Sequence, residues 1–100
     1  MGMSNLDSVV GIGMYTIVVY DVGEKRVAKV CKYLRTVLQW MQNSVFEGEL
    51  TEAQMERMKR RLQTLMEPEE DALLIYMLSD EKWLKRETIG VEKSFRSNLL

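Results

Sequence analysis

Residues 14–22 (MYTIVVYDV) form a run of β-branched and aromatic residues that is apolar at both odd and even positions. Side chains alternate between the two faces of a strand, so this run is typical of a strand that is buried on both faces. A chain of 100 residues has little material for covering both faces and builds only a marginal core. We therefore expect helices on one face of this strand and a second subunit on the other.

Two amphipathic helices are predicted after the first strand. Apolar residues recur at helical spacing over residues 24–37, between basic residues on the remaining positions. The pattern returns from Thr51, whose hydroxyl group can form a capping box with Gln54 three residues later. The spacing therefore predicts one helix on each side of the middle of the chain.

Three further strands surround the second helix. Residues 38–50 indicate two short strands with a tight reversal near Asn43 and Ser44, because polar turn formers interrupt residues that favour strands. Residues 72–78 (ALLIYML) indicate a buried strand, and residues 85–90 are predicted to add one short strand after it.

The predicted order is that of an α+β, ferredoxin-like βαββαβ fold with an extra C-terminal strand, in which both helices cover one face of a four-stranded antiparallel sheet. One domain is predicted over residues 14–90. Residues 1–13 are interpreted as an N-terminal extension and residues 91–100 as a frayed tail.

Missing residue types exclude several classes of protein. Cys31 is the one cysteine and there is no histidine, which excludes an intrachain disulfide, a structural zinc site and an imidazole-based catalytic pair. A hydrolytic reaction would then depend on a hard cation bound by carboxylates. The chain also lacks the run of about 18–20 apolar residues that a membrane span needs. We expect a cytoplasmic protein without membrane contacts.

Basic residues are concentrated on the two helices although the net charge is −1. Residues 24–37 carry five Lys or Arg against one Glu, or +4, and residues 51–66 carry four against two, or +2. Such a face can bind a phosphate backbone, and it can also be a solvated helix surface. The residues that we predict to bind nucleic acid are Lys25, Arg26, Lys29, Arg57, Arg60 and Arg61.

Three segments resemble the second core family of CRISPR-associated proteins. They are Tyr20-Asp21 at the end of the first strand, the block QNSVFEGEL at residues 42–50, and the late Ile89-Gly90. The resemblance covers residues 14–90 and implies a homodimer whose sheets face each other, with the C-terminal strand crossing to the neighbour. It implies either a Mg²⁺-dependent nuclease acting on RNA or DNA, or a bridge between dimers of the CRISPR integrase during spacer acquisition.

The role of Asp21 distinguishes the nuclease from the bridging function. A charge at the end of an apolar strand is costly unless it is solvated, caps the next helix or holds a cation, and the residues alone favour capping. The resemblance favours metal binding instead. Two Asp21 side chains brought together by the dimer axis would then hold Mg²⁺, with Mn²⁺ as a substitute, to activate water for phosphodiester hydrolysis.

Three other residues belong to the predicted site. Ser44 would hydrogen-bond a phosphate or a metal-bound water, as a catalytic residue beside Asp21. Tyr20 and Phe46 would stack on a base or pack in the core or interface, and packing is the usual role of large aromatic residues. Three functions stay open: a metal-dependent endonuclease, a structural DNA-binding adaptor without catalysis, and a ferredoxin-like regulatory domain that binds a small ligand.

Overall fold

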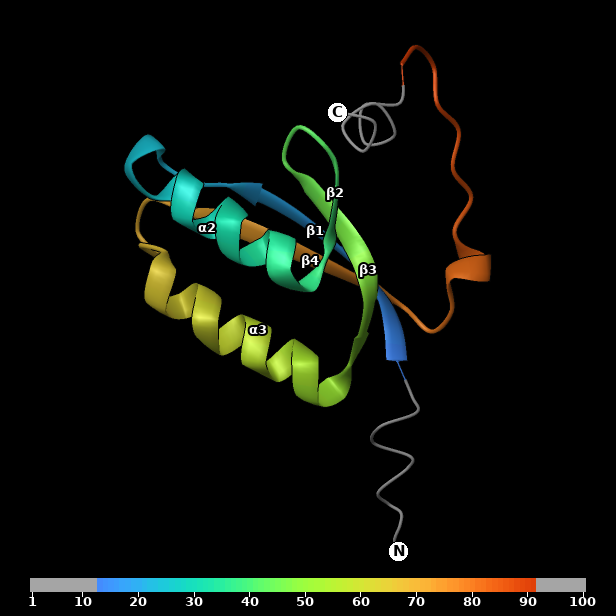
Figure 1. Ribbon diagram of the computed structural model, residues 1–100, viewed down its shortest axis with the longest axis horizontal. Helices are drawn as coiled ribbons and strands as arrows, with labels where there is room; N and C mark the ends of the chain where they lie inside the picture. The colour runs from blue at the N-terminus through green and yellow to red at the C-terminus, as the bar shows by residue number, and fades with distance from the viewer. Residues whose placement is uncertain (1–12, 92–100) are drawn as a thin grey trace, which may run out of the picture.

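The computed structural model describes residues 13–91, which form four strands, two α-helices and one short 3-10 helix. The elements are, in chain order, β1 (Gly13–Asp21), α2 (Glu24–Val37), β2 (Gln39–Gln42), β3 (Val45–Thr51), α3 (Glu52–Leu65), β4 (Ala72–Leu78) and η1 (Glu81–Trp83). This order confirms the predicted βαββαβ arrangement, and both helices lie on the same side of the sheet (Figure 1). The predictions for residues 1–12 and 92–100 lie outside the described residues.

Local sequence signals account for the ends of several elements. The capping box forms as predicted: the Gln54 backbone N–H donates to Thr51 Oγ1 at 3.2 Å, and the Thr51 backbone N–H donates to Gln54 Oε1 at 2.8 Å. The reversal between β2 and β3 places Asn43 at a φ of 44°, a left-handed conformation that asparagine tolerates better than most residues. These two signals fix where α3 starts and where the hairpin turns.

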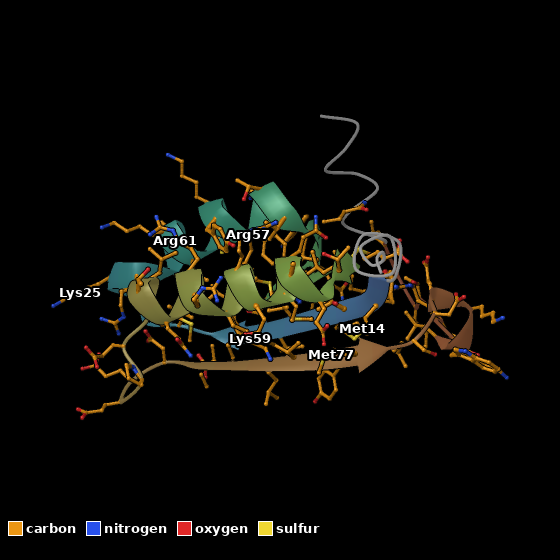
Figure 2. The ribbon with its side chains drawn as sticks, turned by 90° about the horizontal axis from the view of Figure 1, so that it is seen from below. Met14, Lys25, Arg57, Lys59, Arg61 and Met77 are labelled. Atoms are coloured by element: carbon orange, nitrogen blue, oxygen red, sulfur yellow. The ribbon has the colours of Figure 1, made fainter. Side chains whose placement is uncertain are left out.

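The sheet has the strand order β2-β3-β1-β4, so β1 lies inside it and pairs antiparallel with β3 and β4. Thr16, Val18 and Tyr20 of β1 point toward the helices and are buried. The helices supply the other half of this core, as the edge-on view of the layers shows (Figure 2). The buried helical residues are Val30 and Leu34 of α2 and Met55, Met58 and Leu62 of α3.

The second face of the sheet is only partly covered by residues 13–91. The alternate β1 residues Tyr15, Ile17 and Val19 point to it and are half-buried. On the edge strand β4, Leu74 and Tyr76 are 57% and 54% exposed. We call this side the open face. Its apolar character agrees with the prediction that the first strand needs cover on both sides.

Residues 84–91 do not add a further strand to this sheet, so the strand predicted over residues 85–90 is absent from the described chain. A short strand needs an edge to pair with, whereas this segment crosses to the open face. There the Arg86 guanidinium pairs with the Glu47 carboxylate of β3. Ile89 is fully exposed beyond this contact.

Within residues 13–91, no helix has the length and apolar character that crossing a membrane requires.

Candidate metal and nucleic-acid site

Asp21 is the last residue of β1 and pairs with Ala72 of β4. Its side chain is exposed, and it continues the row of Tyr15, Ile17 and Val19 along the open face. It does not cap α2, because the N-cap residue is Gly23 and no side chain bonds the first turn. The capping role favoured by the residues alone is therefore wrong, and Asp21 presents a solvated carboxylate at the end of a central strand.

Asp21 does not belong to a ready-made metal site within one subunit. Among residues 13–91, no group of three or more Cys, Asp or Glu side chains is placed to hold an ion. Magnesium, however, often binds one or two carboxylates and takes its remaining ligands from water and substrate phosphate. The exposed carboxylate oxygens of Asp21 fit such an ion when a second copy of the chain supplies another Asp21.

Ser44 lies beside the end of β1, in the turn between β2 and β3. The Tyr20 backbone N–H donates to the Ser44 carbonyl oxygen at 3.1 Å, so Ser44 lies opposite Tyr20, the residue before Asp21. The structure thus places Ser44 near the end of β1, although it is 23 positions from Asp21 in the sequence.

The rings of Tyr20 and Phe46 are buried beneath the helices, with centroids 6.0 Å apart. The Tyr20 hydroxyl contacts Cys31 Sγ at 2.9 Å and donates to the Asn43 carbonyl oxygen at 3.3 Å. Burial and the contact with Cys31 raise the pKa of Tyr20 to about 12. Because Phe46 is 0% and Tyr20 8% exposed, neither ring offers a face on which a base could stack, and both residues belong to the core.

Arg26 is engaged by two acidic residues and differs in this from the other predicted nucleic-acid ligands. Its Nε donates to Asp71 Oδ2 at 2.6 Å, and its Nη2 donates to Asp71 Oδ1 at 3.0 Å and to Glu70 Oε1 at 2.9 Å. These bonds raise the pKa of Arg26 further above its usual value. An exposed run of basic residues cannot reveal such a pairing, because the partners lie more than 40 positions away.

Two adjoining hollows between α2 and α3 collect most of the remaining basic residues. One, of about 320 Å³, is lined by Lys29, Lys32, Tyr33, Thr36, Arg61 and Leu65. The other, of about 550 Å³, is lined by Tyr33, Val37, Arg57, Arg60, Arg61 and Thr64. We call the two together the interhelix groove. Five cations line it and none of the lining residues is acidic.

Figure 2 shows Arg57 and Arg61 on the side of α3 that faces α2, whereas Lys59 lies on the side toward β4. The sequence prediction missed Lys32 and Tyr33. The signal was present, because residues 29, 32, 33 and 36 of α2 follow the i, i+3, i+4, i+7 spacing of one helix face, as residues 57, 60, 61 and 64 do on α3.

Glu47 is a second notable carboxylate on the open face. It is 5% exposed and accepts hydrogen bonds from the Tyr15 hydroxyl at 2.7 Å and from both terminal nitrogens of Arg86. Burial acts to raise the pKa of Glu47, but the bonds from Arg86 and Tyr15 outweigh it and hold the pKa below its usual value. Glu47 is thus a fixed ion-pair partner and not a free base.

The chain matches, over residues 14–86, the family model described as CRISPR associated protein Cas2. A curated relative from Thermococcus kodakarensis, named CRISPR-associated endoribonuclease Cas2, is 52% identical over 81 residues that cover 81% of this chain and 93% of the relative. A relative of the same name from Dictyoglomus turgidum is 42% identical and covers 87% of this chain and 100% of its own length.

Two solved structures agree with these matches. A crystal structure described as cas2 superposes with a TM-score of 0.76 at 45% identity, covering 82% of this chain and 92% of the other. The crystal structure of Streptococcus pyogenes Cas2 superposes with a TM-score of 0.69 at 32% identity, covering 77% of this chain and 100% of the other.

Proposed function

Because the chain belongs to the CRISPR-associated protein Cas2 family, we propose that it is a homodimeric, metal-dependent endonuclease that serves in CRISPR spacer acquisition. The observation that carries this proposal is the exposed Asp21 carboxylate, which ends a central strand, caps no helix and lies on the open face. The relatives are named endoribonucleases, and this supports an activity on phosphodiester bonds.

The proposed homodimer joins two open faces. Leu74 and Tyr76 are large apolar side chains that water would otherwise cover, and burying them against a second copy stabilises the pair. The same contact brings the two Asp21 carboxylates to one axis, because each continues the row of residues on that face. The segment that follows Arg86 would then cross to the neighbouring sheet, where the free edge of β4 offers a partner for the strand predicted over residues 85–90.

We expect light scattering to give a dimer mass at micromolar protein concentration. Tyr76→Asp should shift the mass toward the monomer while the helical content by circular dichroism stays unchanged, because it would place an unpaired charge in the interface. The dimer should weaken about tenfold or more. Lys59→Asp is the matched control, because Lys59 is on the side of α3 toward β4 and outside the open face. A wild-type chain that remains monomeric at this concentration would rule out the dimer.

The proposed chemistry uses the two carboxylates and the neighbouring turn. Mg²⁺ bound at this site would supply an activated water and would neutralise charge that develops on the scissile phosphate. Asp21 from each subunit would hold that ion, and Ser44 would donate a hydrogen bond to a phosphate oxygen from the turn beside it. Integrase dimers and the DNA or RNA backbone are the partners of this subunit in the proposed role.

The metal requirement tests the proposal directly. Purified full-length protein is incubated with labelled RNA, single-stranded DNA and duplex DNA in Mg²⁺, in Mn²⁺ and in a chelator. We expect cleavage with either metal and none with the chelator, because Asp21 alone cannot activate water at neutral pH. Equal cleavage in the chelator would contradict a metal-dependent mechanism.

A structural adaptor is the second candidate, and the position of the interhelix groove favours it. The groove lies on the helices, whereas Asp21 belongs to the open face of the sheet. Nucleic acid bound along the groove therefore need not touch Asp21, and the dimer could bridge two integrase dimers without cutting anything. Binding of duplex DNA with no cleavage under any metal condition would support this function. Family membership gives no support to a small-ligand regulatory domain.

A further inference from the structure

Asp71 is a buried carboxylate in the turn between α3 and β4. Its side chain is 0% exposed and both of its oxygens accept two hydrogen bonds. Oδ1 accepts from the Gly23 backbone N–H at 2.8 Å and from Arg26 Nη2 at 3.0 Å. Oδ2 accepts from Arg26 Nε at 2.6 Å and from the Glu67 backbone N–H at 2.8 Å. A carboxylate that is satisfied in this way holds its partners in one arrangement.

Asp71 and the residue after it contact the end of β1 at two points. Gly23, the N-cap of α2, is two residues beyond Asp21, and Asp71 binds its N–H. Ala72, which follows Asp71, pairs with Asp21 in the sheet. Asp71 is therefore hydrogen-bonded to the segment just after Asp21, and the next residue, Ala72, pairs with Asp21 in the sheet.

The connection between β1 and α2 is short. Only Val22 and Gly23 separate the strand from the helix. A Cβ added to Gly23 would lie 2.7 Å from Arg26 Nη2 and 3.4 Å from Asp71 Oδ1, so the turn packs tightly against the ion pair. A change at Asp71 must consequently displace the turn that follows Asp21.

We propose that Asp71 is a positioning residue for the Asp21 metal site, because its bonds to Gly23 and Arg26 fix how β1 ends and therefore where the Asp21 carboxylate lies. This inference rests on the proposed function of Asp21. It also gives Arg26 a structural role in place of the predicted contact with nucleic acid. Asp71 itself stays away from the ion, since its oxygens are occupied by their four donors.

The test compares Asp71→Asn with Glu70→Gln in the full-length protein. Asp71→Asn keeps the shape but removes one acceptor oxygen and the charge, so the turn loosens. Glu70→Gln is the matched control, because Glu70 binds the same guanidinium but is 67% exposed and has no bond to Gly23. The readouts are Mn²⁺ affinity, from the free-ion signal in electron paramagnetic resonance, and the cleavage rate as a function of Mn²⁺ concentration.

We expect Asp71→Asn to weaken Mn²⁺ binding about tenfold, the lower end of the range for residues that orient metal ligands. Saturating Mn²⁺ should restore most of the rate, because the reacting groups are still present. Amide exchange at Gly23 should become faster, whereas Glu70→Gln should resemble wild type in every readout. If Asp71→Asn does not fold, Arg26→Lys replaces it, since lysine keeps the charge but loses the two-point contact.

Wild-type Mn²⁺ affinity in a folded, dimeric Asp71→Asn or Arg26→Lys protein would overturn the positioning role while leaving the Asp21 site intact. Asp21→Asn serves as the reference in the same assay. If Asp21→Asn also kept wild-type Mn²⁺ affinity, the metal site itself would be refuted, and the role of Asp71 with it. The two failures are therefore distinguishable.

Discussion

Asp21→Asn is expected to remain folded and dimeric but to lose cleavage of nucleic acid in Mg²⁺. Asparagine keeps the size of the side chain and removes the negative charge that binds a hard cation. Stability should change little, because Gly23 and not Asp21 is the N-cap of α2. The cleavage rate should fall by more than about a hundredfold, since losing an outer partner of a metal ligand alone costs ten- to a hundredfold. The change affects both carboxylates of the dimer at once.

Glu49→Gln is the matched control for this experiment. Glu49 is an exposed carboxylate of β3 that pairs with Tyr15 in the sheet register and has no place in the proposed site. Glu49→Gln should leave the cleavage rate unchanged. Asp21→Asn should leave the binding of duplex DNA unchanged. Undiminished cleavage by Asp21→Asn, in protein free of contaminating nucleases, would remove Asp21 from the mechanism and leave the adaptor function.

Replacing Lys29 and Arg61 together by Ala should produce the second large effect, a loss of nucleic-acid affinity with a flatter salt dependence. Both residues line the interhelix groove, one from each helix. If each neutralises one phosphate, the slope of log affinity against log salt should fall by about 2 per subunit on duplex DNA. The loss should be similar for unrelated sequences, because contacts to the backbone carry no sequence information. Fluorescence anisotropy over a salt series measures both quantities.

Two single variants make this prediction specific. Lys59→Ala removes a cation from the side of α3 that faces β4 and should leave the slope almost unchanged. Arg26→Ala should also leave the slope unchanged, because its guanidinium is held by Asp71 and Glu70. A slope that falls with Arg26→Ala but not with the double replacement would place nucleic acid at the end of β1 and not in the groove.

The sequence predicted the elements well because their signals are local. Helical spacing gave the bounds of α2, the capping box gave the start of α3, and Asn43 marked the hairpin. The strand predicted over residues 85–90 does not form in the single chain and stays a prediction for the dimer, because pairing depends on an available edge, which no local pattern specifies. The apolar residues of the open face predicted a second subunit, but no local pattern specifies the contacts that this subunit would make.

The candidate site was less predictable because its contacts are long-range. Nothing near Arg26 in the sequence distinguishes it from Lys29, yet one is tied to Asp71 and the other lines the groove. Tyr20 and Phe46 were singled out by type, and their burial was decided by the helices that pack over them. Asp21 was singled out because a charge at the end of an apolar strand is unusual, and the family resemblance supplied its role as a metal ligand, which stays a prediction.

The ion pair between Arg86 and Glu47 has a consequence for the assembly of two copies. Both residues belong to the same chain, so the C-terminal segment is ordered as far as residue 86 before a second copy arrives. The loss of conformational freedom over residues 79–86 then accompanies folding and does not weigh against association. Residues 87–90 are then the part that would pair with the neighbouring sheet. The Arg86–Glu47 ion pair thus preorganises the segment, and removing it by Glu47→Gln should slow the association of two copies.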